Sequence, residues 1–238
     1  MMLCRLVLTV LALVLANGSQ LQHNQAAIMP VTAVRVGPVN ARDVSLGNLI
    51  DQLSENTHVA FCIENRDNAN RMRSTLGSLS INLNIDPVED LQAVLSRLER
   101  TYPVVQWSVS AGVIVIGSRD IKNDPLEMVI KASAFQGTVG QFVAYLNSKT
   151  PGLMADTLEI SGMYDRNAVY ALEFKSDVTV REALSALTRE YGIRWTATIR
   201  DEGTVVQIPD AADGKSTEVR TGRVTLMFSR GSAPQRVR

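Results

Sequence analysis

The chain has 238 residues, and its 24 Lys and Arg residues balance 24 Asp and Glu residues, so the net charge is zero. This balance argues against a nucleic-acid-binding protein, because such proteins carry a general excess of positive charge. The length is sufficient for two small domains.

The first residues have the order of a secretory signal peptide. A basic residue precedes an apolar run from Leu6 to Ala16, and small residues follow it. We therefore predict a cleavable signal peptide at residues 1–18 and a linker at 19–30. The alternatives are an uncleaved membrane anchor or a core segment, although the run is shorter than the ~20 apolar residues that span a bilayer.

Few residues of the chain are suited to catalysis or to metal binding. Cleavage leaves Cys62 as the only cysteine, and its apolar surroundings predict a buried side chain, with an intermolecular disulfide as the alternative. A catalytic pair of Cys62 with His58 is a weaker alternative, because a cysteine between apolar strand residues is unreactive. The only other histidine is His23, and no nucleophile motif or phosphate loop occurs. We therefore predict no enzyme, no metal and no cofactor.

Apolar periodicity predicts a small α/β unit at residues 31–117. Apolar residues at helical spacing alternate with short segments in which every second residue is apolar. The predicted elements are a strand at 31–39, a helix carrying Leu46, Leu49, Ile50 and Leu53, strands at 59–63 and 79–85, a helix carrying Val88, Leu91, Val94, Leu95 and Leu98, and a hairpin of strands at 104–109 and 113–116.

The same order of elements returns at residues 127–209. The predicted elements are a strand at 128–135, a helix carrying Val139, Phe142, Val143 and Leu146, strands at 153–160 and 168–174, a helix carrying Val180, Ala183, Leu184, Leu187 and Tyr191, and a hairpin of strands at 193–199 and 204–208. Trp107 and Trp195 each follow the second helix of their copy. Because they recur at one place, we expect them to pack in a core or between the copies, with exposed binding aromatics as the alternative.

Together these patterns predict an α+β protein. Its mature part would consist of two tandem small two-layer α/β domains, at residues 31–117 and 127–209, joined by a linker at 118–126. Each domain would have the order β-α-β-β-α-β-β.

Several segments resemble a known module. The segment Val178–Leu187, followed by Tyr191-Gly192-Ile193-Arg194-Trp195, resembles the short N-terminal (STN) module of secretins and TonB-dependent receptors. The helix that starts at Val44-Ser45-Leu46 resembles it as well. The resemblance implies a periplasmic docking module: in secretins such modules stack into rings, and in signalling receptors one contacts a membrane-bound regulator. No long β-rich segment follows residue 209, so we expect the partner to be a separate chain.

Arginine residues supply the candidate contacts with a partner. Residues 210–238 are predicted to form a basic, largely disordered tail with a short strand at Val224–Phe228. Such a tail can contact anionic lipid or an acidic protein surface, and a solvated tail without a partner is the alternative. The polar loop at 64–77 is either a second contact or a solvated connection. The candidate residues are Arg66, Arg71, Arg73, Arg220, Arg223 and Arg230.

The expected function is that of a periplasmic or extracellular, non-enzymatic module that docks on another cell-envelope protein. Addition of a strand to an open sheet edge is the expected mechanism, without nucleic acid. Two alternatives stay open. One is a secreted ligand-binding protein or enzyme with its site between the two domains. The other is a self-assembling subunit of a ring or filament.

Overall fold

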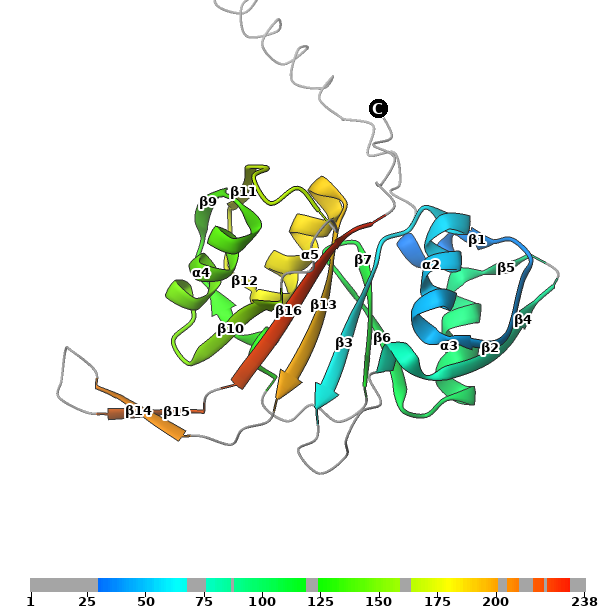
Figure 1. The fold of residues 1–238 in the computed structure, drawn as a ribbon, viewed down its shortest axis with the longest axis horizontal. Helices are drawn as coiled ribbons and strands as arrows, with labels where there is room; N and C mark the ends of the chain where they lie inside the picture. The colour runs from blue at the N-terminus through cyan, green and yellow to red at the C-terminus, as the bar shows by residue number, and fades with distance from the viewer. Residues whose placement is uncertain are drawn as a thin grey trace, which may run out of the picture. The chain divides into compact units, whose positions relative to one another are not determined.

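The computed structural model describes residues 30–67, 76–86, 88–118, 124–158, 164–200, 205–209, 216–220 and 222–231. The predicted signal peptide, and the linker up to residue 29, lie outside these residues. From Val31 onward the chain forms one compact unit. It is of mixed α+β type, with four α-helices in the described part and a six-stranded mixed sheet (Figure 1).

Two halves follow each other along the chain, and each has two helices. The first half contains β1 (Arg35–Val36), β2 (Val39–Ser45), α2 (Leu46–Thr57), β3 (Phe61–Asp67), β4 (Ser80–Ile85), β5 (Glu89–Asp90), α3 (Leu91–Thr101), β6 (Val105–Ser110) and β7 (Val113–Ser118). Short 3-10 turns at Val31–Ala33 and Leu76–Ser78 replace part of the strand predicted at 31–39 and part of the loop predicted at 64–77.

The second half opens with a 3-10 turn, η3 (Pro125–Glu127), at a place where the sequence predicted only a linker. It then contains β8 (Val129–Ile130), β9 (Ser133–Gly137), α4 (Val139–Lys149), β10 (Leu153–Leu158), β11 (Tyr170–Phe174), β12 (Val178–Thr179), α5 (Val180–Tyr191), β13 (Ile193–Arg200), β14 (Val205–Pro209), β15 (Ser216–Arg220) and β16 (Gly222–Arg230).

Local sequence explains where the helices begin. Ser45 caps α2 by accepting a hydrogen bond from the Asn48 amide at 3.2 Å. In α4, Thr138 and Gln141 exchange hydrogen bonds in a capping box, which satisfies two amides at the helix start. The apolar side chains predicted to form the helical faces are buried in all four helices, apart from Val88, which precedes α3, and Tyr191 at the end of α5, both of which are exposed.

The two halves share the large sheet, whose strand order is β10-β16-β13-β3-β7-β6 (Figure 1). Strand β13 of the second half pairs in parallel with β3 of the first, from Thr196 opposite Ile63 to Arg200 opposite Asp67. The arrangement of two tandem domains is therefore not confirmed, because main-chain hydrogen bonds run continuously from one half into the other.

Each half packs its own core, and the two cores lie on opposite faces of the shared sheet. In β3, Phe61 and Ile63 face the first core, and Cys62 faces the second. This follows from strand geometry, because successive side chains point to opposite faces. Helices α2 and α3 cover one face, and α4 and α5 cover the other (Figure 1). The helices of each half also contact a small antiparallel pair, β2–β4 in the first half and β9–β11 in the second.

The end of the chain corrects two predictions. The antiparallel partner of β13 is β16, not the segment at 204–208, which pairs with β15 instead. Strand β16 lies between β10 and β13 and buries Val224, Leu226 and Phe228. The short strand predicted at Val224–Phe228 is present and extends to Gly222–Arg230, where its alternating apolar side chains complete the second core. The prediction of disorder is wrong for residues 216–220, which form β15.

A tyrosine at the end of the second helix fulfils the same role in both halves. The Tyr102 hydroxyl accepts a hydrogen bond from the amide of Asn82 in β4 at 2.6 Å. The Tyr191 hydroxyl accepts one from the Ala171 amide in β11 at 2.9 Å and donates to the Ala171 carbonyl at 2.6 Å. These bonds tie each second helix to the small sheet, so the repeat extends to individual side chains.

Candidate functional site

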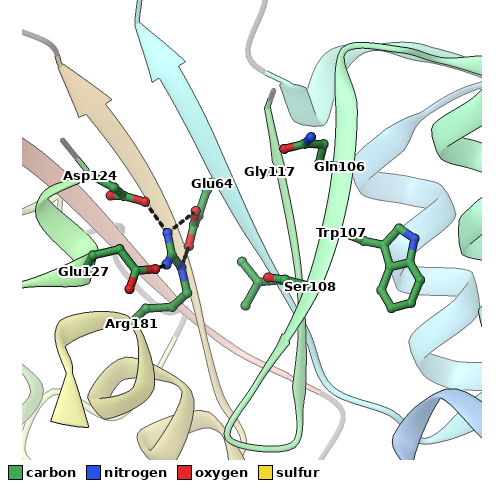
Figure 2. A pocket seen from close by; sticks show the side chains of 9 residues that line it. Glu64, Gln106, Trp107, Ser108, Gly117, Asp124, Glu127 and Arg181 are labelled. Carbon is green, nitrogen blue, oxygen red and sulfur yellow. Dashed lines mark hydrogen bonds and ion pairs between the residues drawn. The ribbon is translucent and has the colours of Figure 1, made fainter. Parts of the chain in front are cut away.

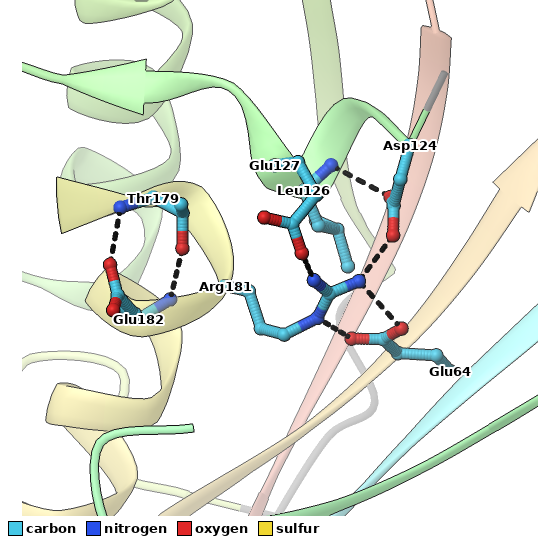
Figure 3. Close-up of polar contacts among 7 residues, drawn as sticks. All are labelled: Glu64, Asp124, Leu126, Glu127, Thr179, Arg181 and Glu182. Atoms are coloured by element: carbon cyan, nitrogen blue, oxygen red, sulfur yellow. Dashed lines mark hydrogen bonds and ion pairs between the residues drawn. The ribbon is translucent and has the colours of Figure 1, made fainter. Parts of the chain in front are cut away.

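A charged cluster lies where the two halves meet, and it centres on Arg181, the second residue of α5. The start of this helix is held by a capping box: the Glu182 amide donates to Thr179 Oγ1 at 3.1 Å, and the Thr179 amide donates to Glu182 Oε2 at 2.7 Å (Figure 3). This rigid first turn directs the Arg181 side chain towards β3.

Three carboxylates surround the Arg181 guanidinium (Figure 3). Glu64 of β3 accepts hydrogen bonds from Nε at 2.6 Å and from Nη2 at 3.0 Å, a bidentate geometry that strengthens the pair. Asp124 binds Nη2 of Arg181, and Glu127 binds Nη1. Asp124 also accepts a hydrogen bond from the Leu126 amide at 2.9 Å. The cluster thus joins β3 of the first half to α5 and η3 of the second.

Burial makes these charges energetically important. The side chains of Arg181, Glu64 and Asp124 are 12%, 4% and 5% exposed, whereas that of Glu127 is 58% exposed. Burial raises the pKa of Glu64 above its ordinary value, and the hydrogen bonds from Arg181 oppose this rise. Burial alone would lower the pKa of Arg181, but its bonds to Glu64 and Asp124 outweigh burial and raise this pKa. Arg181 therefore stays charged.

A cavity of about 380 Å³ opens beside the cluster (Figure 2). Gln106 and Ser108 of β6 contribute to its lining together with Gly117 of β7. A β-carbon at Gly117 would lie 3.6 Å from Glu64 Oε2, so the glycine keeps the space over this carboxylate open. Figure 2 shows the Trp107 indole on the side of β6 away from the cluster.

Chemically, the cluster is suited to holding the halves together and to binding a polar group. All three guanidinium nitrogens of Arg181 already bind carboxylates of this chain. The cavity is lined by amide, hydroxyl, carboxylate and guanidinium groups, and by Val115, Trp107 and Gly117. Among the described residues, no three His, Cys, Asp or Glu side chains are placed to hold a metal ion.

The two outer strands of the large sheet form a second candidate site. Among the strands that the structure describes, β6 and β10 each have a neighbour on one side only. Four of the eight large apolar side chains exposed in the described residues lie on these strands or next to them: Val104, Val109, Met154 and Leu158. An exposed strand edge with apolar side chains is a template for pairing with another strand.

Of the candidate arginines, the structure describes the side chains of Arg66, Arg223 and Arg230, and it does not bring these three together. Arg66 lies in β3 opposite Ile199, whereas Arg223 lies in β16 opposite Arg200, so the two side chains point to opposite faces. Arg230 is exposed at the other end of β16. Arg220 belongs to β15, and Arg71 and Arg73 lie outside the described residues.

The sequence did not predict the Arg181 cluster, although it contains one signal of it. Arg181 stands in the first turn of a helix, where a cation is unfavourable next to the positive end of the helix dipole. Such a residue requires compensation from acidic groups. Nothing in the sequence indicated that Glu64, which is distant along the chain, would supply it.

Predictions for Cys62, Trp107 and Trp195 agree with the structure. Cys62 is a free, fully buried side chain, and burial raises the pKa of its thiol to about 12. His58 is the exposed C-terminal cap of α2, with a left-handed φ of 56°. Trp195 is buried in the second core, and Trp107 packs half-buried against the first. His23 lies outside the described residues.

Within the residues that the structure describes, no helix is long and apolar enough to cross a membrane.

Comparison with known proteins gives no relative: no protein-family model, no curated protein and no solved structure matches the chain.

Proposed function

We propose that this chain is an exported, non-enzymatic docking module that binds another protein of the cell envelope by adding a strand to an open edge of its large sheet. The observation that carries the proposal is the edge strand β6, where Val109 is 46% exposed beside a backbone edge that no other described strand covers. Main-chain hydrogen bonds at such an edge provide affinity, and the exposed side chains provide selectivity.

The Arg181 cluster supports this role because it makes the two halves a single rigid platform. Glu64 belongs to the strand next to β7, which in turn pairs with β6. A partner that binds β6 would therefore act on an element anchored to both halves. The signal-like start of the sequence and the resemblance to secretin and TonB-receptor modules support the periplasm as the location. The periplasmic location is therefore inferred from the sequence and from this resemblance, whereas the docking mechanism is inferred from the geometry of the sheet edge.

A crosslinking experiment tests the proposal. The tagged mature chain is crosslinked in its native envelope fraction, and bound proteins are compared for wild type, Val109→Lys and Val129→Lys. Val129 is 51% exposed but belongs to β8, away from the large sheet, so it is a matched control. A lysine on an edge strand disfavours strand addition.

We expect one envelope protein to be recovered with wild type and with Val129→Lys and to be lost with Val109→Lys. Equal recovery with all three would exclude docking through β6. Recovery of nothing above background would contradict the docking function itself.

The cavity beside the cluster supports a second candidate function, binding of a small polar ligand at the join between the halves. Its position agrees with the preference of ligand sites for the borders between structural units. A ligand that occupies it should raise the melting temperature of the wild type and have no such effect on Ser108→Phe, which fills the cavity. A panel of small polar and cationic compounds that changes neither melting temperature would count against this function.

A further inference from the structure

The two halves contribute equivalent sets of strands to the large sheet. In the second half, β10 pairs in parallel with β16, and β16 pairs antiparallel with β13. In the first half, β3 pairs in parallel with β7, and β7 pairs antiparallel with β6. The order β10-β16-β13 is therefore repeated as β3-β7-β6 across the same sheet (Figure 1).

The internal join between the halves is formed by β13 of the second half, which lies parallel to β3 of the first half. Because β13 corresponds to β6, and β3 corresponds to β10, the two strands left at the open edges are the counterparts of the two that join inside the molecule. The contact between β13 and β3 thus occurs once inside the protein. The counterparts of these two strands, β6 and β10, are the outer described strands of the sheet.

The geometry of the repeat does not close on itself. Following the pairings across the sheet, β10 and β3 run in opposite directions, and the two cores lie on opposite faces. The symmetry operation that relates the two halves moves along the sheet by three strands. It also reverses the direction of the strands and exchanges the two faces of the sheet. Applied twice it restores the original orientation, so β6 runs in the same direction as β10. A contact with these properties is head-to-tail and leads to open assemblies.

The side chains at the open edges are compatible with such a contact. On the face of β6 towards the first core, Val109 is exposed. On β10, the side chains facing away from the second core include Met154 and Leu158, which are 39% and 52% exposed. When β6 and β10 join as β13 and β3 do, these three apolar side chains share one face of the sheet.

On the face away from its own core, each of β13 and β6 has small hydroxyl side chains, and in the internal join buried Ile63 of β3 shares this face. In the internal join, Thr196 and Thr198 of β13 lie next to β3. At the corresponding positions β6 has Ser108 and Ser110, counted from the aligned Trp107 and Trp195. Small hydroxyl side chains therefore occupy the same face of both strands.

Side chains of the preceding helix bind the backbone near both strand starts, but at different positions. Asn147 of α4 bonds both the amide and the carbonyl of Ala155, the third residue of β10, each at 2.8 Å. In the first half the bonded residue is Val59, which lies two positions before β3: Ser54 Oγ donates to its carbonyl at 2.8 Å, and its amide donates to Thr57 Oγ1 at 3.2 Å.

In the internal join, β13 pairs with β3 only from Ile63 onward, beyond this capped start. Because Asn147 occupies both backbone groups of Ala155, and alternate residues of a parallel strand face the same side, Thr157 is the described position of β10 whose backbone groups can begin to pair with a partner strand.

From these observations we propose that two copies of this chain join head to tail, with β6 of one copy lying parallel to the end of β10 of the next. The proposal rests on the docking function proposed above and identifies a second copy as a partner for the open edges.

Sedimentation of the purified mature chain over a concentration series tests this proposal, with each variant first checked for native circular dichroism. Wild type and Val129→Lys should associate as concentration rises. Val109→Lys blocks the β6 edge and Leu158→Lys blocks the β10 edge, so each alone should weaken association by about tenfold or more.

Mixing the two blocked variants distinguishes head-to-tail pairing from symmetric pairing. Each retains the edge that the other lacks, so an equimolar mixture should form a one-to-one dimer that does not grow further. Association of Val109→Lys alone, or of Leu158→Lys alone, at wild-type strength would overturn the proposal. A wild type that remains monomeric at all concentrations would also overturn it, while edge-dependent recovery of a different envelope protein would leave the docking function intact.

Discussion

Trp107 and Trp195 occupy the same place in the two halves but have different surroundings. Trp195 is fully buried, because β13 lies inside the sheet between β16 and β3. Trp107 is only partly buried, because no described strand lies beyond β6. Nearly the same local sequence therefore yields a fully buried residue in one half and a half-buried residue in the other. The presence of a neighbouring strand decides the burial of an aromatic side chain more than its position in the repeat does.

The largest effect is expected when β16, one of the two strands that enclose Trp195, is removed. Deleting residues 210–238 removes β16, which pairs with both β10 and β13 and buries Val224, Leu226 and Phe228. We expect the second half to lose its cooperative unfolding transition, measured by thermal circular dichroism, and its amide protection, measured by hydrogen exchange.

Deleting only residues 232–238 is the control, because it leaves β16 whole, and it should change the transition little. A truncated chain that keeps its protection in α4 and α5 would show that β16 is dispensable for the second core.

The two tryptophans can be compared directly. Trp195→Ala should reduce the free energy of unfolding by about 3–5 kcal/mol, because it leaves a large cavity in the second core. Trp107→Ala should cost roughly half as much, since part of the side chain is already in contact with water. Urea unfolding of both variants measures the difference. Equal losses would mean that the edge position of β6 does not determine the energetic role of its tryptophan.

The second residue of the second helix offers another comparison between the halves. Arg181→Ala removes the counter-charge of buried Glu64 and Asp124, so we expect a loss of about 3–5 kcal/mol of unfolding free energy. The corresponding residue of α3 is Gln92, which is exposed, and Gln92→Ala should change stability by less than about 0.5 kcal/mol. A small effect of Arg181→Ala in urea unfolding would contradict the anchoring role of the cluster.

The pH dependence of the Glu64 contribution is the smallest of these effects. Because burial raises its pKa in the folded state, the folded protein binds this proton more tightly than the unfolded chain does. The cost of ionised Glu64 is therefore present above the raised pKa and is relieved as the pH falls through it towards the ordinary value of 4.5.

Wild-type stability relative to Glu64→Gln should consequently rise between neutral pH and pH 4.5, since glutamine does not titrate there. Urea unfolding of both proteins at several pH values measures this difference. A relative stability that falls as the pH is lowered would mean that the Arg181 bonds outweigh burial at Glu64.

Sequence patterns predicted the local elements well. The four helices were recognisable from apolar residues at helical spacing. Burial of Cys62 followed from its apolar neighbours. These features depend on contacts within one helix turn or one strand, and such contacts are encoded by residues close together in the chain.

The sequence alone therefore determined the helices, most strands, the repeat and the side chains that fill the two cores. Only the tertiary structure decided which strands pair: β16 with β13 in place of the nearer segment at 205–209, and β13 with β3 across the two halves. It also decided that Arg181 meets Glu64. The physical reason is that main-chain hydrogen bonds are the same for every strand, so partner choice depends on how whole apolar faces are buried together.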